Sequence, residues 1–351
     1  MNRSRLALSC AAILMLTICS GAAMAQAPPA PAGKPDTPGG QPAPAAGRGA
    51  APLAPLTPAA IEKAGPILTA AQQALGGDAL AQLKSLSAKG QTRRLRGNNL
   101  VPILFEMDVE LPDKYVRRDE SPAENTDPTS AGFNGNDLIQ VPPPAAPPAR
   151  AGAPPAPAGS LDAARAARVR TVKQDFVRFA LGLFARSFDT FPLTFGYVGQ
   201  AQAPQGSADV LDVRGADNFA LRFFVHGETH LPIMVSWNLP PTSVIVTVPG
   251  QPPPATVAPG AVVITGPPAP PASASQEEKD TYAKAVTALR QQAQATPVEH
   301  RIYFADYRDV NGLKLPFRLR RAIGADTTEE TTFDRYQINP KLSPQKFAVV
   351  R

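Results

Sequence analysis

The stretch YFADYRDVNGLKLPFRLRRA, residues 303–322, contains a strand whose residues are sorted by face. The apolar set is Leu313, Leu315, Phe317 and Leu319, and it alternates with Lys314, Pro316, Arg318 and Arg320. A period of two is the pattern of a strand that buries one face. We therefore expect the apolar face to be buried and the arginines to face water.

Two other segments show the same alternation. The first has Val101, Ile103, Phe105, Met107 and Val109 on one face and continues through a Leu111–Lys114 turn into a second strand. The second has Phe219, Leu221, Phe223 and Val225, then a turn at Gly227, then Ile233, Val235 and Trp237. Each segment predicts a hairpin with one apolar face. Together they predict a large antiparallel sheet in which sequential strands pair.

Three segments predict helices: residues 57–77, 160–186 and 275–295. The first ends at Gly76, a residue type that stops helices. The second has Ser160 as an expected cap and the strongest amphipathic pattern, with apolar residues at three-and-four spacing: Val169, Val172, Phe176, Phe179 and Leu183. The third has only a weak apolar stripe, which predicts a surface position.

The ends and the proline content divide the chain. Residues 1–25 have two arginines, an apolar run and a final small-residue triplet, which predicts a secretory signal peptide cleaved after Ala25 and a periplasmic product. Residues 26–58, 141–159 and 239–275 are rich in proline, so we expect a disordered tether followed by two inserted loops. Two β-branched runs in the last loop could pair as a hairpin. Residues 59–351 would then form a single domain.

Composition excludes some classes of function. Both cysteines, Cys10 and Cys19, lie in the predicted signal peptide, so the exported chain would have no disulfide, thiolate nucleophile or cysteine metal site. The formal charge is +6, and the two arginines of the signal peptide account for part of it. Basic residues are not clustered with aromatic residues, which argues against nucleic-acid binding and leaves peripheral contact with anionic lipid open.

The sequence contains no catalytic pattern. His226 and His230 flank Glu228, but Gly227 intervenes and the context is a strand turn, unlike the helical zinc-protease motif. No serine lies in a nucleophile elbow. Acidic residues such as Glu329 lie near arginines at strand ends, where ion pairing is the simpler interpretation. We therefore predict no enzyme activity, no cofactor and no metal.

Several motifs, taken in order, resemble the LolA/LolB-type lipoprotein-carrier superfamily. They are ALGGDALAQLKSLSAKGQ, LPDKYVRR, GETHLPIMVSW, the opening stretch and TTFDRYQINPKLSPQKF, and they span most of residues 59–347. The resemblance implies an α+β, mainly β fold, in which a curved antiparallel sheet forms an unclosed half-barrel with a few covering helices. It implies acyl chains on the concave face. The two proline-rich inserts depart from the family, as does the missing counterpart of the carrier's lid arginine.

The leading hypothesis is a monomeric periplasmic carrier that sequesters a lipid or an acylated protein between the sheet and the 160–186 helix. The residues expected to line its apolar cavity are Phe105, Met107, Val109, Phe176, Phe179, Leu183, Leu221, Phe223, Leu315, Phe317 and Leu319. The alternative is an interaction or sensor module of the same fold whose core is filled by its own side chains. An exported hydrolase is the third class.

Overall fold

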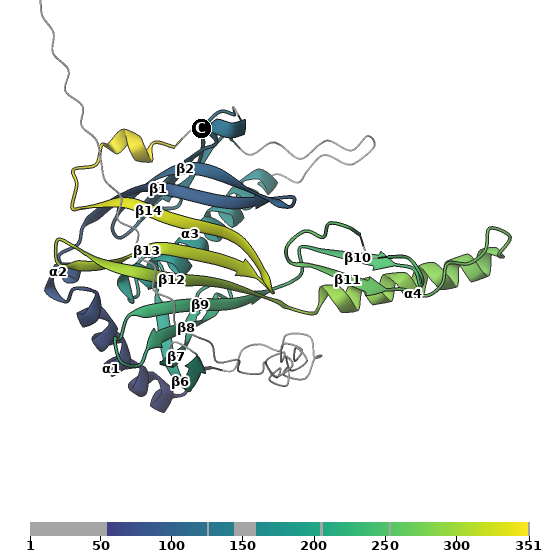
Figure 1. Ribbon diagram of the computed structural model, residues 1–351, viewed down its shortest axis with the longest axis horizontal. Coiled ribbons are helices and arrows are strands. Elements are labelled where there is room, and N and C mark those ends of the chain that lie inside the picture. Colours follow the sequence, from purple (N-terminus) through teal and green to yellow (C-terminus); the bar gives the residue numbers. More distant parts are fainter. Residues whose placement is uncertain (1–54, 125, 144–158, 204–205, 253, 350–351) are drawn as a thin grey trace, which may run out of the picture. The chain divides into compact units, whose positions relative to one another are not determined.

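The alternating segments of the sequence are strands of one large sheet (Figure 1). The computed structural model describes residues 55–124, 126–143, 159–203, 206–252 and 254–349, all within the unit Gly47–Arg351. Among these residues twelve strands form a sheet with the order β5-β4-β3-β2-β1-β14-β13-β12-β9-β8-β7-β6. Every neighbouring pair is antiparallel, and the edge strands β5 and β6 do not pair with each other. The predicted mainly β, unclosed fold is confirmed.

The first five strands form a meander, and the last strand joins it at its start. Their bounds are β1 Ser85–Arg96, β2 Asn99–Glu110, β3 Lys114–Glu120, β4 Thr129–Asn134 and β5 Asp137–Val141. The other seven strands form a second meander. Their bounds are β6 Leu193–Ala203, β7 Gly206–Gly215, β8 Ala220–His226, β9 Pro232–Leu239, β12 Val298–Val310, β13 Leu313–Ile323 and β14 Asp326–Ile338. Strand β14 pairs with β13 on one side and with β1 on the other.

The apolar faces predicted from the alternation form one core. In β13 the odd-numbered apolar residues from Leu313 to Leu319 are buried, and the arginines at 318 and 320 are exposed. The inward faces of β2 and β8 are buried in the same cluster, together with one face of the long helix. Burying this apolar surface is the main favourable term in folding.

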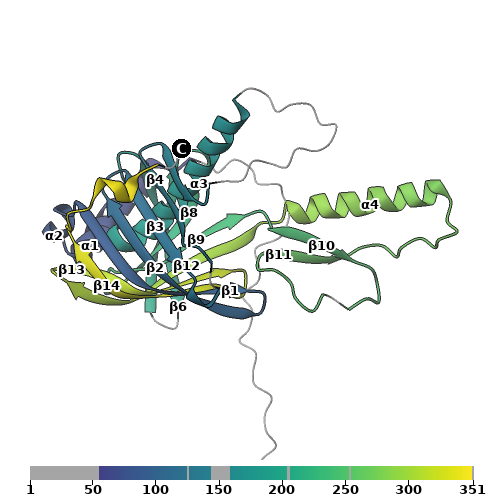
Figure 2. The same ribbon diagram turned by 90° about the horizontal axis from the view of Figure 1, so that it is seen from above.

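Helix α3 (Ser160–Phe184) packs on the inner face of the sheet (Figure 2). The helix begins at Ser160, so the residue in the cap position is Gly159 rather than the predicted Ser160. Gly182 lets α3 approach β12 closely, because a Cβ atom there would lie 2.1 Å from the Phe304 ring. The Tyr307 hydroxyl donates a hydrogen bond of 2.8 Å to the Gly182 carbonyl. These contacts fix the C-terminal half of α3 to the sheet.

Helix α1 (Pro58–Leu75) packs beside the edge strand β6, and a single helical turn, α2 (Asp78–Ala81), follows it. The hydroxyl of Thr57 caps α1, and the helix ends at Gly76, as predicted. A Cβ atom at Gly76 would lie 2.6 Å from the carbonyl oxygen of Gly312, and its φ of 139° also favours glycine. The glycine thus lets the helix end lie against the β12–β13 turn.

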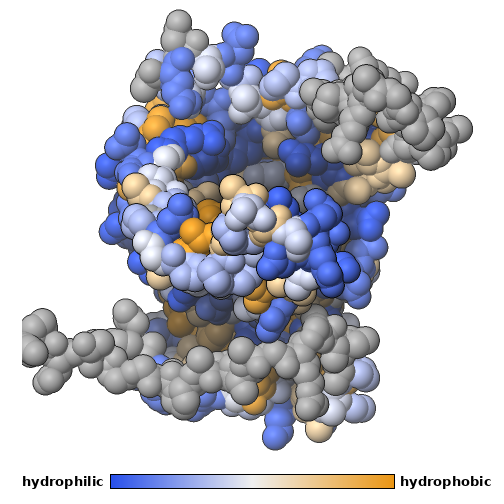
Figure 3. Space-filling model, turned by 90° about the vertical axis from the view of Figure 1, so that its right-hand side faces the viewer, coloured by the Kyte–Doolittle hydropathy of each residue, from blue (hydrophilic) through white to orange (hydrophobic). Residues whose placement is uncertain are grey.

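The segment between β9 and β12 forms a separate small layer. Strands β10 (Ser243–Thr247) and β11 (Ala261–Thr265) pair, and α4 (Gln276–Gln294) packs beside β10. The pairing is parallel, so the predicted hairpin is wrong, because parallel strands cannot be joined by a tight turn and need a crossover connection. The side of the molecule shown in Figure 3 is mostly hydrophilic, with hydrophobic residues in small separate groups.

Near the end of the described residues, η2 (Pro344–Phe347) contacts β3 and β4. A satellite core of Val116, Ile139 and Phe347, separate from the main one, lies there. The single turn η1 (Pro122–Glu124) lies against β2 instead. Lys346 pairs with Glu106 at 2.8 Å and with the buried Asp108 at 2.6 Å. Within the described ranges no helix has the length and apolar character needed to cross a membrane. The predicted signal peptide, most of the tether, and residues 144–158 lie outside those ranges.

Candidate functional site

A cavity of about 500 Å³ lies between α3 and the inner face of the sheet. Strands β1, β3, β4, β5, β13 and β14 contribute to its walls, and α3 contributes residues from Arg168 to Phe179. Ligand sites of small molecules commonly have volumes of about 300–1,000 Å³. The cavity therefore has the size of a ligand site, and α3 forms one of its walls.

One side of the cavity is apolar. Val172, Phe176 and Phe179 line it from successive turns of α3, and Tyr115 lines it from β3. The rings of Tyr115 and Phe176 pack with their centroids 4.8 Å apart. Burial raises the pKa of Tyr115 to about 12, so its hydroxyl is neutral at physiological pH. This side can receive a hydrocarbon chain.

All eleven residues predicted to line an apolar cavity are buried in the main core. Phe176 and Phe179 line the cavity directly. The other nine belong to the packed core and are absent from its walls: Phe105, Met107, Val109, Leu183, Leu221, Phe223, Leu315, Phe317 and Leu319. Phe105 contacts the cavity wall from the core side, because the guanidinium of Arg117, a residue of that wall, lies 4.6 Å from the centroid of its ring.

The other side of the cavity is charged. We call Arg94, Arg117, Arg321, Asp119 and Glu329 the arginine cluster; all five residues line the cavity. Each belongs to the inward face of its strand, in line with apolar or small residues further along. The inward faces are thus apolar at one end of these strands and charged at the other.

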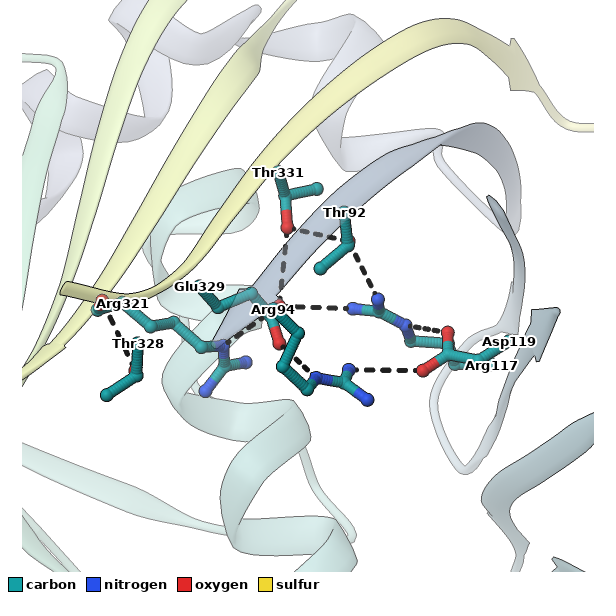
Figure 4. Close-up of polar contacts among 8 residues, drawn as sticks. All are labelled: Thr92, Arg94, Arg117, Asp119, Arg321, Thr328, Glu329 and Thr331. Atoms are coloured by element: carbon teal, nitrogen blue, oxygen red, sulfur yellow. Dashed lines mark hydrogen bonds and ion pairs between the residues drawn. The ribbon is translucent and has the colours of Figure 1, made fainter. Parts of the chain in front are cut away.

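The cluster is held by ion pairs around Glu329 (Figure 4). Arg94 Nε lies 3.0 Å from Glu329 Oε2, Arg117 Nη1 lies 3.6 Å from Oε1, and Arg321 Nε lies 3.7 Å from Oε1. Asp119 accepts hydrogen bonds from Arg117 Nε at 2.6 Å and from Arg94 Nη2 at 3.1 Å. Three guanidinium groups therefore surround two carboxylates, which leaves an excess of one positive charge.

A layer of threonines separates the arginine cluster from the apolar core. The hydroxyl oxygens of Thr92 and Thr331 lie 2.9 Å apart, and Thr92 accepts a hydrogen bond of 2.8 Å from Arg117. Thr331 donates to Glu329 at 3.3 Å. Buried polar groups are costly unless they are hydrogen-bonded, so this layer makes the change from apolar to charged lining possible.

The pKa of Glu329 is set by its burial and by the three arginines around it. Burial alone would raise the pKa of this carboxyl, but the charges of Arg117, Arg321 and Arg94 outweigh it and lower the pKa from 4.5 to about 2. The pKa of Arg117 is raised, because the attraction of Glu329 and Asp119 exceeds the effect of burial. Glu329 and Arg117 are therefore both ionised across the physiological pH range.

Sequence reasoning placed Glu329 near arginines but did not bring the arginine cluster together. A signal was present: the alternation that buries Leu319 continues to Arg321, two residues further on the same face. The alternation of Thr92 likewise continues to Arg94. Charged residues in line with an apolar face mark the place where the strand passes from the core into a polar cavity.

The histidine motif lies elsewhere, at the β8–β9 turn. The ring Nδ1 of His226 accepts hydrogen bonds from the backbone N–H groups of Glu228 at 3.1 Å and Thr229 at 3.3 Å. The motif therefore closes the turn, as the sequence context predicted. Across the described ranges no group of three or more histidine, cysteine or acidic side chains is arranged to hold a metal ion.

Three solved structures are similar to this chain over most of its length, at low sequence identity. A protein of the LolA superfamily from Nitrosomonas europaea is 11% identical and covers 81% of this chain and 96% of its own, with a TM-score of 0.39. A domain from Vibrio parahaemolyticus, provisionally described as an outer membrane lipoprotein-sorting protein, is 8% identical and covers 80% and 95%, with a TM-score of 0.40. A DUF1329 family protein from Desulfovibrio piger is 8% identical and covers 81% and 96%, also with a TM-score of 0.40.

Comparison at the level of sequence gives no match. No family model matches the chain, and no curated protein matches it.

Proposed function

We propose that this protein is an exported, periplasmic carrier-like protein that binds an acyl chain of a lipid or of an acylated protein between α3 and the sheet. The observation that carries the proposal is the cavity of about 500 Å³ with Val172, Phe176 and Phe179 on its helical wall. An apolar wall that is open to a ligand gains free energy when a hydrocarbon chain covers it, by roughly 25 cal/mol per Å² of apolar surface removed from water.

The role proposed is binding, not catalysis. Both carboxylates of the arginine cluster are engaged in ion pairs, and Asp175 pairs with Arg178 at 2.7 Å. A general acid or base needs a pKa near the operating pH, whereas the pKa of Glu329 lies far below it. These features favour a site that holds a ligand without transforming it.

A second candidate is an interaction module with a filled core. It is favoured by the nine predicted residues that pack among themselves instead of lining the cavity. In this case the cavity would hold water, and partner binding would depend on the exposed segments, including the layer of β10, β11 and α4.

The experiment is a titration of the chain from residue 26 onward, freed of bound lipid, with a fluorescent fatty acid. Val172→Trp would place a large ring in the cavity, and we expect it to abolish saturable binding. Ala166→Trp, on the exposed part of α3 outside the cavity wall, is the matched control and should bind like the wild type. Circular dichroism confirms that both variants are folded. A folded wild type that binds no fatty acid would refute the carrier and favour the filled-core module.

A further inference from the structure

We propose that the cavity selects acyl ligands that carry an anionic head group, a carboxylate or a phosphate, and that Arg321 and Arg94 receive that group. This inference rests on the proposed function, because it concerns the head of the ligand whose chain lies along α3. It is drawn from the charge balance of the cavity wall, the free donors of its arginines and the separation of its apolar and charged sides.

The charge balance of the cavity is positive. The arginine cluster has three cations and two anions, so its net charge is positive although each arginine contacts a carboxylate. On the opposite wall, α3 contributes Arg168 and Asp175. Asp175 is already paired with Arg178, and Arg168 donates only to the neutral side chain of Gln140, at 3.2 Å. Neither wall therefore supplies an anion that would neutralise the excess.

The three arginines differ in how many donors they have left. Arg117 uses all three of its side-chain nitrogens, on Asp119, Glu329 and a threonine hydroxyl. Arg94 uses Nε and Nη2. Arg321 contacts Glu329 only through Nε, at 3.7 Å, and among the described residues nothing accepts a hydrogen bond from its two terminal nitrogens.

Figure 4 shows the same difference: dashed contacts surround Arg117 on several sides, whereas the terminal nitrogens of Arg321 have none with the residues drawn. The side chain of Arg321 is 31% exposed, which leaves it accessible from the cavity. A guanidinium presents paired donors in a planar fork that matches a carboxylate or a phosphate. Arg321 is therefore a ready receptor for such a group, with Nη1 of Arg94 as a second donor.

The geometry also orients the ligand. Apolar side chains line the cavity from α3 (Val172, Phe176 and Phe179) and from β3 (Tyr115). The arginine cluster lines it from β1, β3, β13 and β14. A neutral chain would leave the excess charge uncompensated in a partly desolvated site. An amphiphile with its anionic head on Arg321 and its chain along α3 satisfies both sides at once.

The experiment compares probes that share one chain and differ in the head group. Hexadecanoic acid, hexadecyl phosphate and hexadecanol are used to displace a neutral fluorescent probe from the wild type. We expect the acid or the phosphate, or both, to bind at least tenfold more tightly than the alcohol. Whether the acid or the phosphate binds more tightly identifies the head group. Acetate and inorganic phosphate, which lack the chain, should displace the probe only at far higher concentration.

Substitutions of Arg321 test whether this residue causes the preference for an anionic head group. Arg321→Gln should weaken binding of the anionic probe at least tenfold and leave hexadecanol unchanged, and Arg321→Lys should retain part of the preference. Arg318→Gln is the matched control, because Arg318 lies on the same strand but on the exposed outer face. The fold should survive Arg321→Gln, since Glu329 keeps its contacts with Arg94 and Arg117.

The outcomes separate the two proposals. Equal affinity for the acid, the phosphate and the alcohol would overturn the head-group inference and leave the carrier intact. An equal loss of all probes in Arg321→Gln would also overturn it, because the residue would then only shape the cavity. Failure of every probe to bind the wild type would refute the proposed function itself.

Discussion

Replacing Glu329 by glutamine should destabilise the fold at neutral pH. The carboxyl is ionised and nearly buried among Arg94, Arg117 and Arg321, and its pKa is lowered from 4.5 to about 2. Since one pKa unit corresponds to about 1.4 kcal/mol, the shift represents roughly 3 kcal/mol of the free energy of unfolding at pH 7. Glutamine keeps the shape of the side chain but leaves the arginines without their shared counter-ion.

The pH dependence tests the cause. Because the pKa of Glu329 is lower in the folded state, its stabilisation is fully present above about pH 4.5 and is lost as the pH falls through about 2. Urea unfolding of the wild type and of Glu329→Gln should therefore differ by about 3 kcal/mol at pH 7 and by progressively less as the pH falls below 4.5.

The control is the neighbouring residue. Glu330 lies on the opposite face of the same strand, and we expect Glu330→Gln to change stability by no more than about 0.5 kcal/mol. A Glu329→Gln protein as stable as the wild type at pH 7 would refute the reasoning. So would a difference that stays constant down to pH 2, since it could not come from the charge.

Two further substitutions test the packing. Gly182→Ala should destabilise the protein by about 1–3 kcal/mol in urea unfolding, because its new Cβ atom would lie 2.1 Å from the Phe304 ring; Gly65→Ala in α1, where nothing lies within 4 Å, should be neutral or stabilising. Leu319→Glu should unfold the protein, with a loss of about 3 kcal/mol or more in thermal unfolding, because this side chain is only 8% exposed and packs in the core. A folded Leu319→Glu protein that has lost only lipid binding would instead extend the ligand site into the core.

The sequence predicts the sheet well because its strands bury one face only. The alternation of apolar and polar residues therefore indicates which side chains face the core and which face solvent. It correctly predicts the hairpin around Gly227 and the strand from Leu313 to Leu319. The parallel pairing of β10 with β11 is not accessible in this way, because a β-branched run has the same pattern in either direction.

The arginine cluster is harder to predict for a different reason. Its members lie on four strands, and Arg94 and Glu329 are 235 residues apart in the chain. They meet only because β14 pairs with β1, and no local pattern specifies that pairing. The periodicity says which way Arg321 points, but only the strand order says what it points toward.

The pairing of β14 with β1 also constrains how the chain reaches this fold. These two strands lie at the centre of the sheet order, yet the threonines that face each other across them are 239 residues apart. Contacts between distant parts of a chain slow folding, since a large loop must close before they form. The middle of the sheet therefore cannot assemble until the last strand, β14, has been synthesised. Until then the first meander, β1 to β5, has no strand that pairs it with the second. Loss of β14 would therefore separate β1 from β13 in the middle of the sheet, whereas loss of an edge strand would leave the remaining strands paired.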